Sequence, residues 1–198
     1  MNLATDLALA LDGVTFARAA GVEPDPWQAR LLRSSSRQIL LNCSRQAGKS
    51  TSTALLALHV ALYQPGALIL ILAPALRQSQ ELFRKVKAAA SALGIPNDAI
   101  EAESSLRIEL AGGARIETLP GKEMTVRGFS AVSLLIVDEA SRVSDDLYRA
   151  VRPMLAVSGG RVVLLSSPFG KRGFFFEEAF LLEESTAALD IFINRQDA

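Results

Sequence analysis

Four short runs of apolar residues organise the chain, and each is followed by a segment whose apolar positions recur at helical spacing. These runs lack the alternation of polar and apolar residues that marks a half-exposed strand, so we expect strands buried on both faces. Strands that alternate with helices predict an α/β fold, with a mostly parallel sheet flanked by helices on both faces. The predicted strands are RQILLNC (37–43), ALILILA (67–73), SLLIVDEA (133–140) and RVVLLSS (161–167).

The rest of the pattern predicts helices, one hairpin and a tail without a clear pattern. SLRIEL-AGG-ARIETL (105–119) alternates polar and apolar residues around a Gly-Gly turn, which is typical of an added antiparallel hairpin. We expect one domain over 1–183, with a helical extension over 1–23, and a linker or the start of another domain over 184–198. The expected helices are 3–20, 26–33, 48–63, 75–94, 144–156 and 174–184.

Composition fits a single domain and narrows the classes of site. The chain has 198 residues, of which 49% are hydrophobic, enough for a stable core without disulfides or structural metals. Its formal net charge of +0 argues against nonspecific adhesion to nucleic acid. The chain has no uninterrupted run of about 18 apolar residues, so we expect no membrane span. Asp6 and Asp12 make the N-terminal segment a poor secretion signal, so we expect a cytoplasmic protein. One cysteine and one histidine argue against a disulfide, a cysteine-based zinc site and a Ser-His-Asp triad.

The junction between the first strand and its helix has the pattern of a phosphate-binding loop. The pattern is G-x-x-x-x-G-K-[ST], and CSRQAGKS (43–50) departs from it only at Cys43, which replaces the first glycine. A tight loop that runs into a helix N-terminus offers backbone N–H donors and a favourable dipole to a triphosphate. The expected loop residues around the phosphates are Ser44, Arg45, Gln46, Ala47 and Gly48.

The residues that follow supply the side-chain chemistry of such a loop. Lys49 would contact the β- and γ-phosphates of ATP, and the Ser50 hydroxyl would ligate Mg²⁺. Thr51, at the start of the next turn, would reach the α-phosphate. The alternative is a chance Gly-Lys-Ser triplet that caps an ordinary helix.

Two adjacent carboxylates end the third predicted strand. In LLIVDEAS (134–141), four apolar residues fix the strand in the sheet, and Asp138 and Glu139 emerge at its carboxyl end. Asp138 would hold Mg²⁺, and Glu139 would orient and deprotonate the attacking water. A solvated acidic turn is the alternative, but the phosphate loop upstream favours hydrolysis.

SRQAGKST, LLIVDEAS and LLSSPFGKRGFFFEEA together resemble a known family. The set is similar to the ATPase domain of the large terminase subunit of tailed bacteriophages, the motor that packages DNA, over about residues 24–180. The resemblance implies a RecA-like (ASCE) P-loop NTPase that uses ATP and Mg²⁺ to translocate double-stranded DNA into a viral capsid.

The resemblance also implies roles for residues outside the loop and the acidic strand. In PDPWQARLL, Gln28 would bond the adenine edge with Trp27 packed nearby; a core tryptophan is the alternative. Arg45 would sense the γ-phosphate, and Arg127 would reach a neighbouring subunit's nucleotide as an arginine finger, although either arginine is explained equally by solvation. Ser166 and Ser167 would couple the phosphate state to movement, or simply cap the turn into Pro168.

The resemblance further implies partners and a place of action. These are double-stranded DNA, the portal protein, the small terminase subunit and a C-terminal nuclease domain, of which 184–198 would be the start. We expect a homo-oligomeric ring on assembly, a monomer in isolation, no membrane, and action in the host cytoplasm at the procapsid portal. Arg77, Arg84, Lys85 and Lys87 form either a basic strip for DNA or, more simply, a solvated helix face.

Two other functions remain open from the sequence. One is a different RecA-like nucleic-acid ATPase, such as a superfamily-two helicase domain, although Ser141 stands where those proteins often have Asp or His. The other is a nucleotide-binding assembly module that hydrolyses slowly. Nuclease activity is not expected from this chain.

Overall fold

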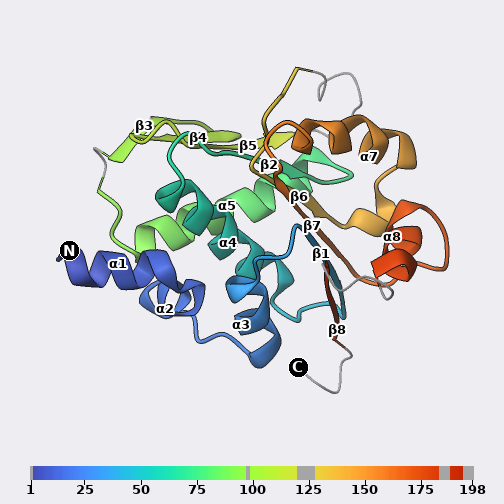
Figure 1. Cartoon of the computed structure of the whole chain (residues 1–198), viewed down its shortest axis with the longest axis horizontal. Helices are drawn as coiled ribbons and strands as arrows, with labels where there is room; N and C mark the ends of the chain where they lie inside the picture. Colours follow the sequence, from blue (N-terminus) through green and yellow to red (C-terminus); the bar gives the residue numbers. More distant parts are fainter. Residues whose placement is uncertain (1, 97–98, 120–127, 183–187, 194–198) are drawn as a thin grey trace.

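An eight-stranded sheet forms the centre of the molecule in our computed structural model, which describes residues 2–96, 99–119, 128–182 and 188–193 (Figure 1). The strand order is β3-β4-β5-β2-β6-β7-β1-β8. The six strands from β5 to β8 in this order are parallel, while β4 is antiparallel to β5 and to β3. The strands are β1 (Gln38–Cys43), β2 (Leu68–Leu72), β3 (Ile100–Glu103), β4 (Arg107–Leu110), β5 (Arg115–Leu119), β6 (Leu134–Asp138), β7 (Arg161–Ser166) and β8 (Ala188–Ile193).

Helices cover both faces of this sheet, as the apolar runs predict. Successive residues of a strand point to opposite faces, so Leu41 packs in one core cluster and Leu40 in the other. The first cluster lies under α1 (Leu3–Leu11), α2 (Gly13–Ala19), α3 (Pro26–Arg33), α4 (Lys49–Tyr63) and α5 (Leu76–Ala92). The second lies under α7 (Asp145–Val151) and α8 (Phe174–Leu182), on the other side of the sheet in Figure 1. The mostly parallel α/β fold and the added hairpin are confirmed.

The N-terminal extension is two helices, so the prediction of a continuous helix over 3–20 is wrong. The break is at Asp12, whose carboxylate accepts hydrogen bonds from the backbone N–H groups of Val14 and Thr15 and so caps α2. Arg33 pairs with the same carboxylate at 2.8 Å. α1 is fastened to α4, because a ring nitrogen of His59 lies 2.9 Å from the Leu9 carbonyl oxygen.

Both ends of the sheet carry a strand that the pattern did not predict. β3 is a short, largely exposed edge strand of sequence IEAE. β8 comes from the tail and pairs in parallel with β1, from Gln38↔Ala188 to Cys43↔Ile193. Residues 188–193 therefore belong to the sheet, where the pattern predicts only a linker or the start of another domain. None of the described helices has the length and apolar composition that a membrane crossing requires.

The helix expected over 144–156 is regular only as far as Val151. It continues as a 3₁₀ turn, η3 (Arg152–Leu155), with Pro153 near its start. A second 3₁₀ turn, η2 (Ala140–Arg142), follows β6 directly and shapes the acidic strand end described below.

Candidate active site

The predicted functional residues meet at the carboxyl ends of three neighbouring strands. β6, β7 and β1 lie side by side, and Asp138, Ser166 and Cys43 are their last residues. A pocket of about 210 Å³ lies beyond these ends. It is lined by Arg45, Gln46, Ala47, Gly48, Lys49, Ser50, Lys85, Asp138, Glu139 and Ser167. This volume is smaller than the roughly 300–1,000 Å³ of pockets that enclose a whole ligand, so the pocket would enclose only part of one.

The loop between β1 and α4 is shaped by two residues in left-handed conformation. Gln46 has φ 65° and Gly48, the N-cap of α4, has φ 83°. The left-handed conformation of Gly48 favours glycine at this position, and a Cβ atom there would also displace the end of the Gln28 side chain, whose Nε2 would lie 2.5 Å away. Cys43 is buried at the start of the loop, where a small side chain suffices.

Lys49 is folded back onto its own loop. Its side-chain nitrogen donates to the carbonyl oxygens of Cys43 at 2.9 Å and Ser44 at 2.7 Å, and the residue is 7% exposed. Burial lowers the pKa of Lys49, while the charges of Glu139 and Asp138 raise it. The ammonium group thus lies in the pocket with two neutral acceptors, and an anion would be a stronger partner.

The two carboxylates occupy different environments. Burial raises the pKa of Asp138 to about 6, against the opposing effects of the Glu139 backbone N–H, which donates to Asp138 Oδ1 at 2.9 Å, and of the charges of Lys49 and Lys85. Glu139 is left-handed, with φ 49°. Its carboxylate lies 3.7 Å from Nε of Arg142. A non-glycine residue held in this conformation stores strain, which is common at functional sites.

Ser166 and Ser167 connect the tip of β7 to the acidic turn. The Ser166 hydroxyl lies 2.6 Å from the Ser141 hydroxyl and accepts a hydrogen bond from the Ser141 backbone N–H at 3.3 Å. The Ser141 hydroxyl also donates to the Ser167 carbonyl at 3.2 Å. Ser167 lines the pocket, and its buried Oγ has no hydrogen-bond partner among the described residues. Ser141 is a site residue that the sequence interpretation missed.

The residues expected at the adenine lie behind the loop. Gln28 is buried; its side-chain oxygen accepts from the Asp25 backbone N–H at 2.9 Å, and its Nε2 donates to the Ala47 carbonyl at 3.4 Å. Trp27 is a core residue whose Nε1 has no partner among the described residues. Arg127 lies outside the described residues, and its expected role stays a prediction.

Two residues near the pocket come from α4 and α5. Thr51, in the first turn of α4, accepts a hydrogen bond from the Lys85 ammonium group at 3.4 Å. Lys85 lines the pocket from α5, so the interpretation of its charge run as a solvated face is wrong for this residue. The loop, the acidic strand end, Ser167 and α5 therefore enclose one site.

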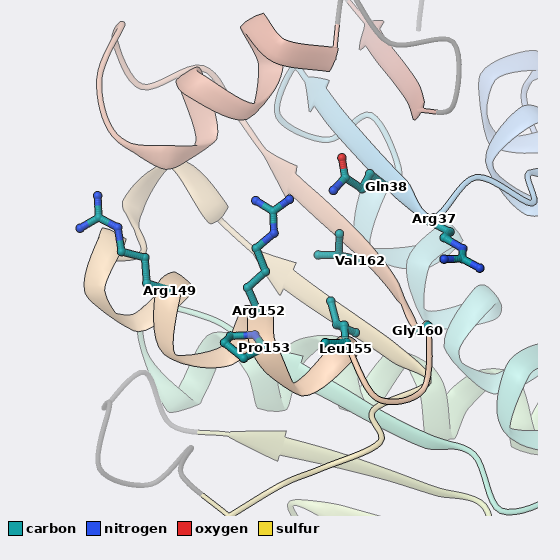
Figure 2. Close-up of a pocket in the computed structure, with 10 residues that line it drawn as sticks. Arg37, Gln38, Arg149, Arg152, Pro153, Leu155, Gly160 and Val162 are labelled. Carbon is teal, nitrogen blue, oxygen red and sulfur yellow. The ribbon is translucent and has the colours of Figure 1, made fainter.

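A second cavity, of about 530 Å³, lies at the opposite end of the strands. It is lined by Arg37, Gln38 and Val162 at the starts of β1 and β7, and by Arg149 and Arg152. Figure 2 shows that its three guanidinium groups diverge rather than converge on one point. This cavity therefore offers no combined charge to a ligand.

One protein-family model matches the central part of the chain. Residues 40–165, more than half of the chain, match the family model described as "RNA cytidine acetyltransferase NAT10/TcmA, helicase domain". The matched segment runs from β1 to β7 and so includes the phosphate loop and Asp138–Glu139. This core is therefore a member of that helicase-type family. The match concerns the helicase domain and carries no information on acetyl transfer.

Relatives and solved structures extend the similarity beyond this core. The large terminase subunit of Thermus virus P23-45 is 25% identical over 186 residues, which are 84% of this chain and 38% of that protein. The large terminase ATPase domain of Thermus phage P74-26 superposes with a TM-score of 0.79 at 21% identity, covering 92% of this chain and 85% of the other. The chain is thus similar in sequence to large terminase subunits and shares the fold of their ATPase domain. It spans well under half of the length of its Thermus virus relative.

A third large terminase gives the same fold with a nucleotide bound. The protein from the thermophilic bacteriophage D6E, in complex with ADP, has a TM-score of 0.63 at 14% identity, covering 95% of this chain and 45% of that one. These TM-scores show that the chain shares the fold of the large terminase ATPase domain, and the resemblance stated from the motif set is confirmed.

Proposed function

We propose that this terminase domain hydrolyses ATP with Mg²⁺ and that hydrolysis drives translocation of double-stranded DNA into a viral capsid. The observation that carries the proposal is the single pocket lined by Lys49, Asp138 and Glu139. The D6E large terminase, which shares this fold, has been solved in complex with ADP, and this supports nucleotide binding by the chain.

The residues of the pocket divide the chemistry between them. Lys49 and the loop backbone would hold the outer phosphates, and Thr51 would reach the α-phosphate. Ser50 and Asp138 fit Mg²⁺, since they present hard oxygen ligands in the same pocket and leave room for phosphate oxygens and water. Bound there, Mg²⁺ neutralises charge that develops on the phosphates. Glu139 would orient the attacking water and take its proton.

The hydroxyl cluster supports a coupling role for the tip of β7. Ser166 contacts Ser141, which lies two residues after Glu139, so a shift of the catalytic turn would be transmitted to Ser166 and Ser167. We assign Arg45 to γ-phosphate sensing and Arg127 to an arginine finger in trans. Gln28 and Trp27 would contact adenine; for Gln28 this requires exchange of its 3.4 Å bond to Ala47 for the base.

The partners follow from the terminase relatives and belong to the proposal. They are double-stranded DNA, the portal protein, the small terminase subunit and a C-terminal nuclease domain. We further propose a homo-oligomeric ring at the procapsid portal in the host cytoplasm, and a monomer for the domain in isolation.

Steady-state ATP turnover of the purified protein, with and without double-stranded DNA, tests this function. Glu139→Gln should retain ATP binding and lose about 10²–10⁴ in turnover, the usual share of a positioned base. Glu177→Gln, an exposed glutamate in the first turn of α8, is the matched control and should match the wild type. Unchanged turnover in Glu139→Gln, or none in the wild type, would overturn the proposal.

A helicase-type nucleic-acid ATPase is a second candidate, favoured by the family match over residues 40–165. Stimulation of turnover by RNA or by single strands, rather than by double-stranded DNA, would support it. Slow turnover that stays flat with protein concentration and with DNA would instead support a nucleotide-binding assembly module.

A further inference from the structure

Lys85 differs from the charged residues beside it on α5. Arg84 pairs with Glu81 at 2.7 Å, and Lys87 pairs with Glu103 at 3.2 Å, both outside the pocket. Lys85 instead lines the pocket together with Lys49 and the two carboxylates. Two lysines from different helices thus face one small space.

The contacts of Lys85 leave its charge largely uncompensated. Its side-chain nitrogen donates to the Thr51 hydroxyl at 3.4 Å, which is a long bond to a neutral acceptor. Within the described parts of the chain, Lys85 forms no ion pair of 4.0 Å or less. Its charge acts across the pocket on Asp138, whose pKa it helps to lower. The group is half-buried, so solvent screens it less than an exposed helix lysine.

We propose that Lys85 is a second phosphate-binding lysine, which contacts phosphate oxygens of the bound nucleotide from α5, beside Thr51. This rests on the proposed function. A phosphate oxygen would give the Lys85 ammonium group an anionic acceptor in place of a long bond to a neutral hydroxyl, which makes the contact stronger. A consequence is that α5, which lies outside the motif segments, contacts the nucleotide directly and shifts with it.

Equilibrium titration with a fluorescent ATP analogue and Mg²⁺ tests the proposal. Lys85→Ala should weaken binding about 10–100-fold, in the range measured for hydrogen bonds to charged groups. Lys85→Arg should restore most of the affinity, because it keeps the charge and the reach. Arg84→Ala and Lys87→Ala, on the same helix but outside the pocket, should stay within about twofold of the wild type.

The design separates this inference from the function on which it rests. If the wild type binds and Lys49→Ala does not, but Lys85→Ala binds normally, the inference is wrong and the function stands. Reduced turnover at unchanged affinity would also overturn a phosphate-binding role. Absence of binding in the wild type would overturn the proposed function itself. Lys85→Gln and the thermal midpoint of each nucleotide-free variant exclude an effect through misfolding, since Lys85 makes only one described hydrogen bond.

Discussion

The two ends of the parallel strands carry similar charged side chains and use them in opposite ways. At the carboxyl end, Lys49 and Lys85 face Asp138 and Glu139 across a pocket of about 210 Å³. Neither lysine has a carboxylate within 4.0 Å among the described residues; their acceptors are carbonyl and hydroxyl oxygens.

At the amino end, the cations are already satisfied or point apart. Arg152 pairs with the buried carboxylate of Glu178. Arg161 donates to the backbone carbonyls of Ser36 at 3.2 Å and Ser34 at 2.8 Å. Arg37 and Arg149 diverge around the larger cavity (Figure 2). The comparison teaches that lysines bonded only to neutral acceptors, gathered in one pocket with carboxylates, single out the candidate site, whereas cavity volume does not.

Lys49→Ala should give the largest contrast between the two ends. Removing the ammonium group from the loop should weaken ATP binding by about 10²–10³-fold, the usual cost of deleting one partner of a buried charge contact. Arg149→Ala, at the amino end, should leave binding within about twofold. Titration with a fluorescent nucleotide measures both. Equal losses in the two variants would erase the distinction between the ends.

Ser166→Ala should reduce turnover by about 10–100-fold, because it removes the acceptor of the Ser141 backbone N–H and leaves the Ser141 hydroxyl with only its bond to the Ser167 carbonyl among the described residues. Ser158, which bonds the Val132 and Leu155 carbonyls near the amino end, is the matched control. Ser158→Ala should lower stability slightly and keep full turnover. Steady-state kinetics and thermal unfolding of both variants separate an effect on turnover from an effect on stability. Equal turnover in Ser166→Ala and Ser158→Ala would contradict a coupling role for Ser166.

Arg152→Ala should affect stability and leave activity intact. Among the described residues, it leaves the buried Glu178 carboxylate with one partner, the Tyr148 hydroxyl at 3.1 Å. We expect a loss of about 1–2 kcal/mol in the free energy of unfolding, below the value for a fully buried pair because Arg152 is half-exposed. Urea denaturation measures it. A tenfold fall in turnover would show that the amino end takes part in catalysis.

Asp12→Asn should have the smallest effect, about 0.5 kcal/mol at neutral pH. The hydrogen bond from Arg33 holds the pKa of Asp12 well below its ordinary value. A depressed carboxyl pKa contributes stability above the unfolded pKa of about 4, and this contribution is lost as the pH falls further. The stabilities of wild type and variant should therefore begin to converge below about pH 4 and meet only below the folded pKa of Asp12. A gap that widens on acidification would contradict this assignment.

The sequence predicts what local pattern controls. The continuous apolar runs of β1, β2, β6 and β7 give the parallel core, and G-K-S with Asp138–Glu139 gives two sides of the pocket. β3 escaped because an edge strand needs few apolar residues, and β3 reads IEAE. β8 reads ALDIFI, which is mostly apolar, and is missed because the tail is interpreted as a linker. The break at Asp12 escaped because the apolar spacing continues across it, while Asp12 caps α2.

The side of the pocket that the sequence did not predict is formed by packing between helices and strands. Lys85 is one cation in a mixed run, and only the packing of α5 against α4 distinguishes it from Arg84 and Lys87. Ser141 gains its significance from contact with Ser166, 25 positions away in the chain. Neither contact follows from spacing along the sequence.

The pairing of β8 with β1 has a mechanical consequence. Ile193 lies opposite Cys43, at the separation of adjacent strands, about 5 Å. β8 therefore ends beside Cys43, the last residue of β1, where the loop to α4 begins. Because β8 pairs with β1 up to this residue, a displacement of the β1–α4 loop on binding the proposed nucleotide would act first on the backbone of β8.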